Sequence, residues 1–129
     1  MLQVIGEITG LAFAVEATVI RAAHSLQSAY EAHVSSDEEH LLAVNALAEA
    51  EAGQAQVIGS ELVPRAATEL FNALGASDTR ISKTLDRHWR NARTVASHNP
   101  VIYKARDIGG WKVNGTPPTS IWQIGKGTA

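Results

Sequence analysis

His98, Asn99 and Pro100 stand together and are the residues of this chain best placed to do chemistry. An imidazole can give or take a proton near neutral pH, so a histidine that faces a cleft can act as a general acid or base. A proline disfavours helical backbone at the residue before it, and an asparagine can cap the helix that the proline opens. We therefore expect His98 to lie in a short break between two helices, facing a cleft.

His98, judged from the residues alone, also suits a simple helix-end role in which it bonds a backbone carbonyl. The other histidines are weaker candidates for a functional site. His88 falls on an apolar row of the preceding helix, so we predict a core or interface residue. Three more histidines show no metal-ligand spacing, so we expect no metal site; these are His24, His33 and His40.

Basic side chains follow one face of the helix before the break. Asp86 precedes Arg90 by four residues, a spacing that allows an ion pair worth a few tenths of a kcal/mol. We interpret the face as solvated and paired, with a cofactor phosphate contact or ion pairs between subunits as the alternatives. Its members are Lys83, Arg87, Arg90 and Thr94, with Arg80 and Arg93 near the edges.

The composition limits the class of protein. The chain has 129 residues, 45% of them hydrophobic and 19% charged, which suits one folded domain with an aliphatic, alanine-rich core. A net charge of −2 argues against nucleic-acid binding. The absence of cysteine fits a reducing cytoplasm. No uninterrupted apolar segment approaches the roughly 20 residues of a membrane span, so no membrane partner is expected.

Helical spacing of apolar residues recurs through most of the chain. The pattern predicts an all-α fold, an antiparallel bundle of about four helices over residues 1–115, followed by an irregular, extended tail over residues 116–129. The predicted helices cover residues 4–33 and 38–74, a third from Asp78 or Thr79 to about Ala96, and a fourth from Pro100 to Gly109–Gly110.

Several local signals set the expected boundaries. Ser36 and Glu39 form a capping box at the start of the second helix, and Pro64 should kink or break that helix. Gly75 should end it as a C-cap. In the tail, apolar residues lie outside any helical pattern and should dock on the domain or on a neighbouring subunit; these are Ile121, Trp122 and Ile124.

The segment Leu85–Gly115 also carries a family resemblance. It reads LDRHWRNARTVASHNPVIYKARDIGGWKVNG and holds two of the three tryptophans and six of the eleven lysines and arginines. LDRHWRNART followed by HNP, IG and VNG resembles the C-terminal helical domain of flavin-dependent monooxygenases with the acyl-CoA dehydrogenase fold, in the dibenzothiophene monooxygenase and sulfone-metabolism branch. The likeness is sharp from about Gly75 to Gly115.

The resemblance implies roles for single residues. His98 matches the histidine that lies beside the flavin ring in these enzymes and is thought to assist formation or protonation of a flavin hydroperoxide. Gly75–Ser77 matches a loop near the phosphate end of a flavin held mainly by the partner subunit, which makes Ser77 and Arg80 cofactor candidates, although a plain C-cap loop explains them equally well. Asn91 is the remaining cofactor candidate, and packing is its alternative.

The function that follows is a C-terminal domain contributing the oligomer core and one wall of the flavin site. FMN or FAD and a small organic substrate would bind the complete enzyme, while this chain alone should be inert and hold no flavin tightly. A homodimer or homotetramer is expected. The alternatives are an acyl-CoA dehydrogenase C-terminal domain, for which Ser97–Pro100 supplies no catalytic glutamate, and a non-catalytic helical oligomerisation module.

Overall fold

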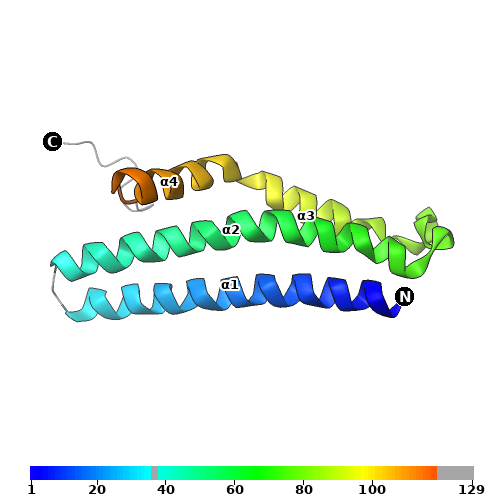
Figure 1. Ribbon diagram of the computed structural model, residues 1–129, viewed down its shortest axis with the longest axis horizontal. Coiled ribbons are helices and arrows are strands. Elements are labelled where there is room, and N and C mark those ends of the chain that lie inside the picture. Colours follow the sequence, from blue (N-terminus) through cyan, green and yellow to red (C-terminus); the bar gives the residue numbers. More distant parts are fainter. Residues whose placement is uncertain (36–37, 119–129) are drawn as a thin grey trace.

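The computed structural model describes residues 1–35 and 38–118, which form four α-helices and two 3₁₀ turns. α1 (Leu2–Ser35) and α2 (Glu38–Leu74) make a long antiparallel pair (Figure 1). The chain then reverses through η1 (Ala76–Thr79) and η2 (Ile81–Lys83), and α3 (Asp86–His98) and α4 (Val101–Asn114) return along α2. The predicted all-α antiparallel bundle is confirmed.

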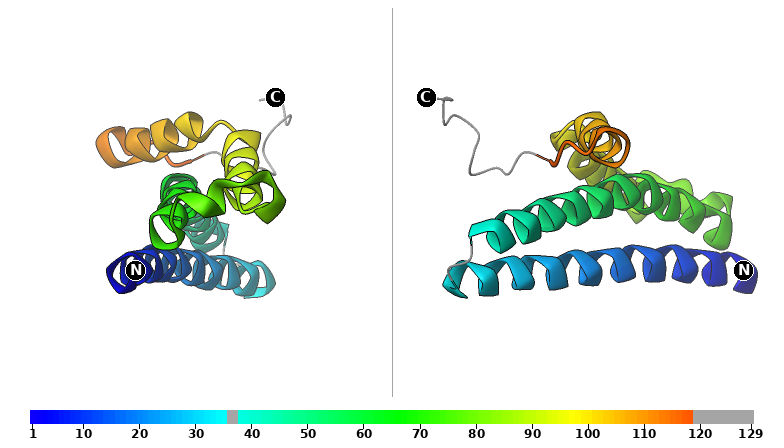
Figure 2. Two further views of the ribbon diagram at one scale, coloured as in Figure 1. Left: turned by 90° about the vertical axis from the view of Figure 1, so that its right-hand side faces the viewer. Right: turned by 60° about the vertical axis from the view of Figure 1, so that its left-hand side comes forward.

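α2 is the central element of the bundle. α1 packs along one side of it, and α3 and α4 together cover another side (Figure 2). The buried alanine and serine positions of α1 and α2 carry small side chains; they are Ala22, Ser25, Ala29, Ala32, Ala48 and Ala50. Small residues let two helices approach closely, but they bury little apolar area, so this core is thin.

The outward face of α1 keeps large apolar side chains in solvent. Phe13 is 72% exposed and Tyr30 is 69% exposed, and Val19, Ile20 and Leu26 are exposed as well. By length and composition, Leu2–Val34 is apolar enough to cross a membrane, because an 18-residue stretch within it has a mean hydropathy of 1.4. The sequence pattern predicts no membrane-spanning segment. The finding differs because alanine, valine and isoleucine raise the mean hydropathy of the helix, although polar residues interrupt its apolar run. Helices packed inside a larger helical assembly have the same composition.

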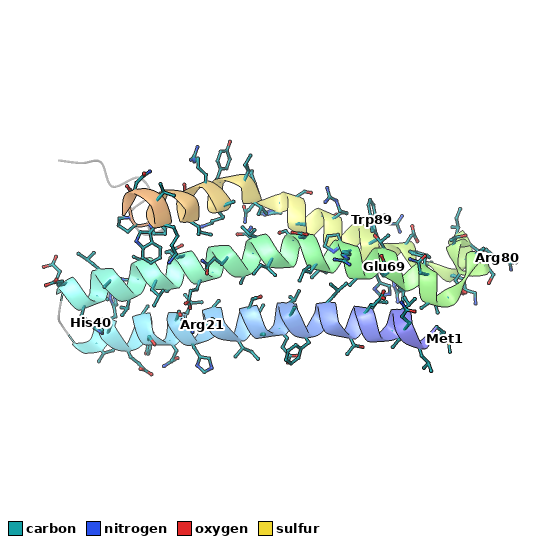
Figure 3. The ribbon with its side chains drawn as sticks, viewed as in Figure 1. Met1, Arg21, His40, Glu69, Arg80 and Trp89 are labelled. Atoms are coloured by element: carbon teal, nitrogen blue, oxygen red, sulfur yellow. The ribbon has the colours of Figure 1, made fainter. Side chains whose placement is uncertain are left out.

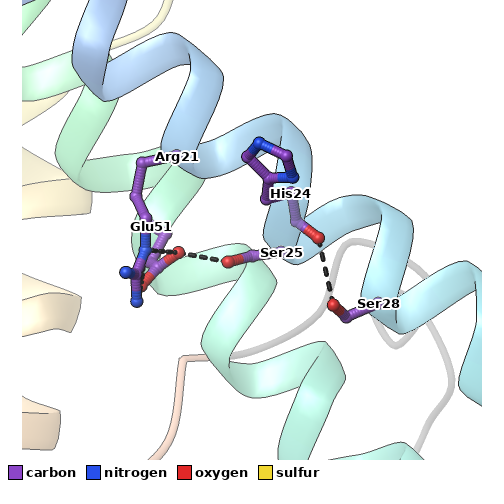
Figure 4. A network of polar contacts seen from close by, with 5 residues as sticks. All are labelled: Arg21, His24, Ser25, Ser28 and Glu51. Atoms are coloured by element: carbon purple, nitrogen blue, oxygen red, sulfur yellow. Dashed lines mark hydrogen bonds and ion pairs between the residues drawn. The ribbon is translucent and has the colours of Figure 1, made fainter.

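An ion pair ties α1 to α2 within this thin core (Figure 4). The Arg21 guanidinium donates to the Glu51 carboxylate with an Nη2–Oε1 distance of 2.7 Å, and the Ser25 hydroxyl donates to the same carboxylate. Hydrogen bonds from Arg21 hold the pKa of Glu51 below its usual range, although burial of the carboxyl opposes them. Ser25 and the charges of Arg21 and Lys112 of α4 lower this pKa further.

α4 packs closely on α2 at a glycine. A Cβ placed on Gly53 would lie 3.3 Å from Ile108 Cδ1, so the absence of a side chain there lets α4 settle on α2. Lys104 of α4 adds an ion pair to Glu49 of α2, with an Nζ–Oε2 distance of 3.8 Å. These two contacts hold α4 against α2.

The first two helices are longer than predicted. α1 extends from Leu2 through Ser35, so Val34 lies in the helix rather than in the expected turn. α2 continues unbroken through Pro64, so of the predicted kink or break the break is wrong. Burial of Pro64 against the bundle offsets the lost backbone hydrogen bond, and the Thr68 hydroxyl donates to the Pro64 carbonyl at 2.9 Å.

The later boundaries also differ. The third helix begins at Asp86 instead of Asp78 or Thr79, because Thr84 has a φ of 52° and interrupts helical backbone after η2. α4 passes through Gly109–Gly110 and ends at Gly115, whose φ of 72° makes it a left-handed C-cap. Packing of Ile108 on α2 offsets the modest helix cost of two glycines.

Two predictions on capping have different outcomes, and two lie outside the described residues. Gly75 ends α2 as predicted, with a φ of 87° and its N–H bonded to the Phe71 carbonyl at 3.1 Å. Asn99 has extended backbone and does not cap α4, whose N-cap is Pro100 without a side-chain hydrogen bond. The capping box that uses Ser36 and the tail docking of residues 119–129 fall on residues that the structure does not describe.

Candidate functional site

The break between α3 and α4 places His98 at a helix end. His98 is the last residue of α3, Asn99 is extended with φ −115° and ψ 125°, and α4 begins at Val101. Pro100 causes this arrangement, because its ring excludes helical backbone at Asn99 and its fixed φ opens the next helix. The His98 side chain is exposed at this point rather than enclosed by helix on both sides.

His98 opens onto a groove between α2 and α3. The groove has a volume of about 870 Å³. Its walls are mostly apolar and small, with Gly59, Val63, Ala66, Ala67 and Leu70 from α2, Ala92, Val95 and Ala96 from α3, and Ile8 from α1. Polar side chains interrupt these walls at Gln56, Ser60, His88, Asn91, Thr94, His98 and Asn99. The groove can therefore take a flat apolar body with a few directed hydrogen bonds.

The structure brings two of the predicted site residues together. His98 and Asn91 both line this groove, and they are seven residues apart on α3. Seven residues are about two turns, so the two side chains share a face roughly 10 Å apart along the axis. His88 lines the groove as well and is exposed, so of its two predicted roles the core one is wrong and the interface one stays a prediction.

Gly75, Ser77 and Arg80 do not join this groove. They lie in and beside η1, where α2 passes into α3, and Figure 3 shows Arg80 at that end of the molecule. The 13 residues of α3 separate this turn from His98 by about 20 Å. The turn also contains Asp78, which pairs with Lys83 at 3.8 Å and lies 3.5 Å from the Ser77 hydroxyl.

The arginines of the basic face of α3 do not line the groove, although Thr94 of the same face does. The predicted Asp86–Arg90 pair is present, with an Nη1–Oδ2 distance of 3.2 Å, and both side chains are more than half exposed. An exposed pair of this kind contributes little to stability. Trp89 projects from the same helix and is 43% exposed (Figure 3). This face is solvated in the single chain, as the first interpretation held.

Gln56 and Ser60 are functional candidates that sequence reasoning missed. Both lie on α2, both are half-buried, and both line the groove opposite α3. The signal was present in the sequence: residues 56, 60, 63, 67 and 70 recur at helical spacing, and only the first two are polar. Which neighbour that stripe faces is decided by packing, so the spacing alone did not reveal it.

Within residues 1–35 and 38–118, no group of three or more histidine, aspartate or glutamate side chains gathers in a way that could hold a metal ion. The chemistry available in the groove is therefore that of imidazole, amide and hydroxyl groups. These groups can donate and accept hydrogen bonds, and the imidazole can also transfer a proton.

Comparison with known proteins places this architecture in a family. The sequence model described as acyl-CoA dehydrogenase, C-terminal domain, matches residues 6–102. This chain belongs to that family. The match covers α1, α2, α3 and the start of α4, so the acyl-CoA dehydrogenase C-terminal domain includes the whole groove and His98.

Among curated proteins, monooxygenases are similar to this acyl-CoA dehydrogenase C-terminal domain. The probable FMNH2-dependent monooxygenase SfnC of Pseudomonas putida is 39% identical over 66 residues, which is 51% of this chain and 17% of the relative. The dibenzothiophene monooxygenase of Rhodococcus erythropolis is 43% identical over 49 residues, 38% of this chain and 12% of the relative. The dibenzothiophene monooxygenase of Mycolicibacterium goodii is 38% identical over 47 residues. The matched segments span less than a fifth of these relatives.

Proposed function

We propose that this chain is the C-terminal helical domain of a cytoplasmic, flavin-dependent monooxygenase of the acyl-CoA dehydrogenase superfamily, acting on a small organic substrate. The observation that carries the proposal is the position of His98, which ends α3 and opens onto the groove between α2 and α3. In this function the groove forms one wall of the flavin site, and His98 faces the ring. The monooxygenase relatives support this choice of reaction.

The residues present fit one wall of a flavin site. The ring of a flavin is flat and largely apolar with polar atoms along one edge, and the groove pairs small apolar walls with hydrogen-bonding groups at His98 and Asn91. When bound, reduced flavin would supply the electrons for oxygen chemistry. His98 would hold or deliver a proton at its imidazole nitrogens, and Asn91 would orient a polar atom by its side-chain amide.

In this proposal Gly75, Ser77 and Arg80 contact a different flavin from the one that His98 faces. About 20 Å of α3 separates Gly75, Ser77 and Arg80 from His98, so the two sets do not converge on one end of a ligand. We assign His98 and Asn91 to one flavin ring, and the Gly75–Arg80 segment to the phosphate end of a flavin held by a partner subunit. A single chain then offers only part of each site, so it should be inert and bind FMN or FAD weakly.

The groove lacks the carboxylate base that the acyl-CoA dehydrogenase alternative requires. Removal of an α-proton from an acyl thioester needs a carboxylate base near the flavin. Among the described residues that line the groove, none is an aspartate or a glutamate. The groove offers the imidazole of His98 instead, which favours the monooxygenase reaction over the acyl-CoA dehydrogenase reaction.

The exposed face of α1 supports a homo-oligomer, either a dimer or a tetramer, in which this domain forms part of the core. Phe13, Ile20 and Tyr30 leave large apolar surfaces in solvent, and such surfaces mark protein interfaces. The same observation favours the second candidate function, a helical oligomerisation module without catalysis. Flavin chemistry separates the two candidates.

A chimaera tests the proposed function. The segment of the Pseudomonas putida monooxygenase that matches this chain would be replaced by the corresponding residues of this chain, and flavin binding and oxygenation would be measured. We expect flavin binding to be retained and His98→Ala to lower the oxygenation rate about 100-fold or more. His24→Ala, at an exposed histidine of α1 outside the groove, is the matched control. A chimaera that folds but whose rate is unchanged by His98→Ala would exclude the assigned role.

A further inference from the structure

The chain contains one Asn–Gly pair, at Asn114 and Gly115. Asparagine is a thermally labile residue, because the backbone nitrogen of the next residue can attack its side-chain amide carbon. That approach is easiest when the next residue is glycine, which has no side chain to obstruct it. The other asparagines precede alanine or proline; they are Asn45, Asn72, Asn91 and Asn99.

The structure places the Asn–Gly pair where solvent reaches it. Asn114 is the last residue of α4, and both Asn114 and Gly115 are exposed. Val113 beside them is 83% exposed, and of residues 111–114 only Trp111 is half-buried. A helix end with so few buried contacts opens at small cost in free energy.

One hydrogen bond opposes the reaction in the folded chain. The nitrogen of Gly115 is the attacking atom, and its N–H donates to the Trp111 carbonyl at 3.0 Å. The nitrogen is free to attack only when this bond opens. The reaction in the folded chain therefore proceeds through fraying of the last turn of α4.

We propose that Asn114 is a site of spontaneous deamidation, and that the order of the last turn of α4 sets its rate. The Gly115 nitrogen bonds to Cγ of Asn114 and loses its proton, the Cγ–Nδ2 bond breaks, and ammonia leaves. Water then opens the resulting succinimide ring at either carbonyl, which yields aspartate or isoaspartate. No oxidant, reductant or cofactor takes part.

The product weakens the turn in which it forms. A carboxylate at position 114 lies at the C-terminal end of α4, where the helix dipole disfavours negative charge. It also joins Asp107 in a small hollow that Asn114 and Arg106 line. Arg106 already pairs with Asp107 there, with an Nε–Oδ1 distance of 3.6 Å.

The test follows deamidation of the full chain by peptide mass spectrometry, in buffer and in urea. The rate in urea divided by the rate in buffer measures the protection that the folded helix end gives, and it removes the intrinsic effect of the neighbouring side chain. Val113→Ala strengthens the last turn and Val113→Gly weakens it, while no buried side chain is lost. We expect the ratio to be roughly 5-fold higher for Val113→Ala than for Val113→Gly.

The same pair of substitutions at Val34 is the matched control. Val34 lies in the last turn of α1 and is 74% exposed, so Val34→Ala and Val34→Gly change a helix end of the same kind elsewhere in the molecule. Both should leave the ratio at Asn114 unchanged. A response equal to that of the Val113 pair would assign the reaction to global unfolding and overturn the role of α4.

Three other results would overturn parts of the proposal. Deamidation at Asn114 no faster than at Asn72, an exposed asparagine in the last turn of α2, would remove the site. An equal ratio for the two Val113 variants would remove the control by helix order. An Asn114→Asp chain that melts no lower than the wild type would remove the effect of the product. No flavin enters these measurements, so they stand apart from the proposed function.

Discussion

The guanidinium of Arg21 on α1 donates hydrogen bonds to the carboxylate of Glu51 on α2 (Figure 4). Its Nε lies 2.9 and 3.0 Å from the two carboxylate oxygens, and its Nη2 lies 2.7 Å from Oε1. Arg21 is 70% exposed whereas Glu51 is 11% exposed, so the carboxylate is the member of the pair taken out of water. The Ser25 hydroxyl donates to the same carboxylate. This cluster is the main polar link between the two long helices.

The first prediction concerns pH. The pKa of Glu51 is lowered in the folded state relative to its usual 4.5. A depressed carboxyl pKa contributes stability that is present above about pH 4.5 and is lost as the pH falls through the lower folded-state value. Glu51→Gln should therefore lower the free energy of unfolding at pH 7, and the difference from the wild type should shrink as acid is added. Urea denaturation from pH 7 to pH 3 measures this, with exposed Glu61→Gln as the control.

A second prediction concerns the contact of α4 with α2. Glycine to alanine inside a helix gains about 1 kcal/mol of helix propensity when the new methyl has room. Gly10 has that room, whereas a methyl on Gly53 would press on Ile108 at 3.3 Å. Gly10→Ala should therefore stabilise the chain more than Gly53→Ala in urea denaturation. Equal stabilisation would mean that the close approach of α4 is not maintained in solution.

The helix ends give a third prediction. Gly75 has φ 87° and ψ 172°, a region that is essentially restricted to glycine, and Gly115 has φ 72° and ψ 7°, which other residues can reach at smaller cost. Gly75→Ala should lower the free energy of unfolding by about 1–3 kcal/mol. Gly115→Asn should cost less, because asparagine tolerates the left-handed region. The order of the two melting temperatures checks this, and the reverse order would contradict it.

Self-association is the fourth prediction. Ile20 on α1 and Ile102 on α4 are both exposed, at 49% and 73%. If the outer face of α1 forms the oligomer interface, Ile20→Glu should shift the chain toward monomer in sedimentation at several concentrations, and Ile102→Glu should not. A wild type that stays monomeric at every concentration would remove the support for an oligomer core.

The fifth prediction is weak flavin binding by the chain alone. The groove that His98 lines is open on one side, and the Gly75–Arg80 segment lies about 20 Å away from His98. Titration of FMN and of FAD, followed by flavin fluorescence, should therefore show no tight complex. Stoichiometric binding at micromolar concentrations would show that one chain holds a complete flavin site.

The break at Pro100 and the end of α2 at Gly75 follow from the sequence by itself. A proline excludes helical backbone at the residue before it, and a glycine adopts positive φ at little cost, whatever surrounds them. The all-α class was also predictable, because apolar residues recur at helical spacing in each long segment. The position of His98 at a helix end follows from the same local rules, and its assignment to a flavin site remains a prediction.

Tertiary packing decided the rest. Pro64 stays inside α2 and Gly109–Gly110 stay inside α4, because burial and the contact of Ile108 with Gly53 offset local preferences of only a few kcal/mol. Packing also decided that Gln56 and Ser60 line the groove with His98 while Gly75, Ser77 and Arg80 lie outside it. Spacing along one helix defines a face, but only the neighbouring helix determines what that face meets.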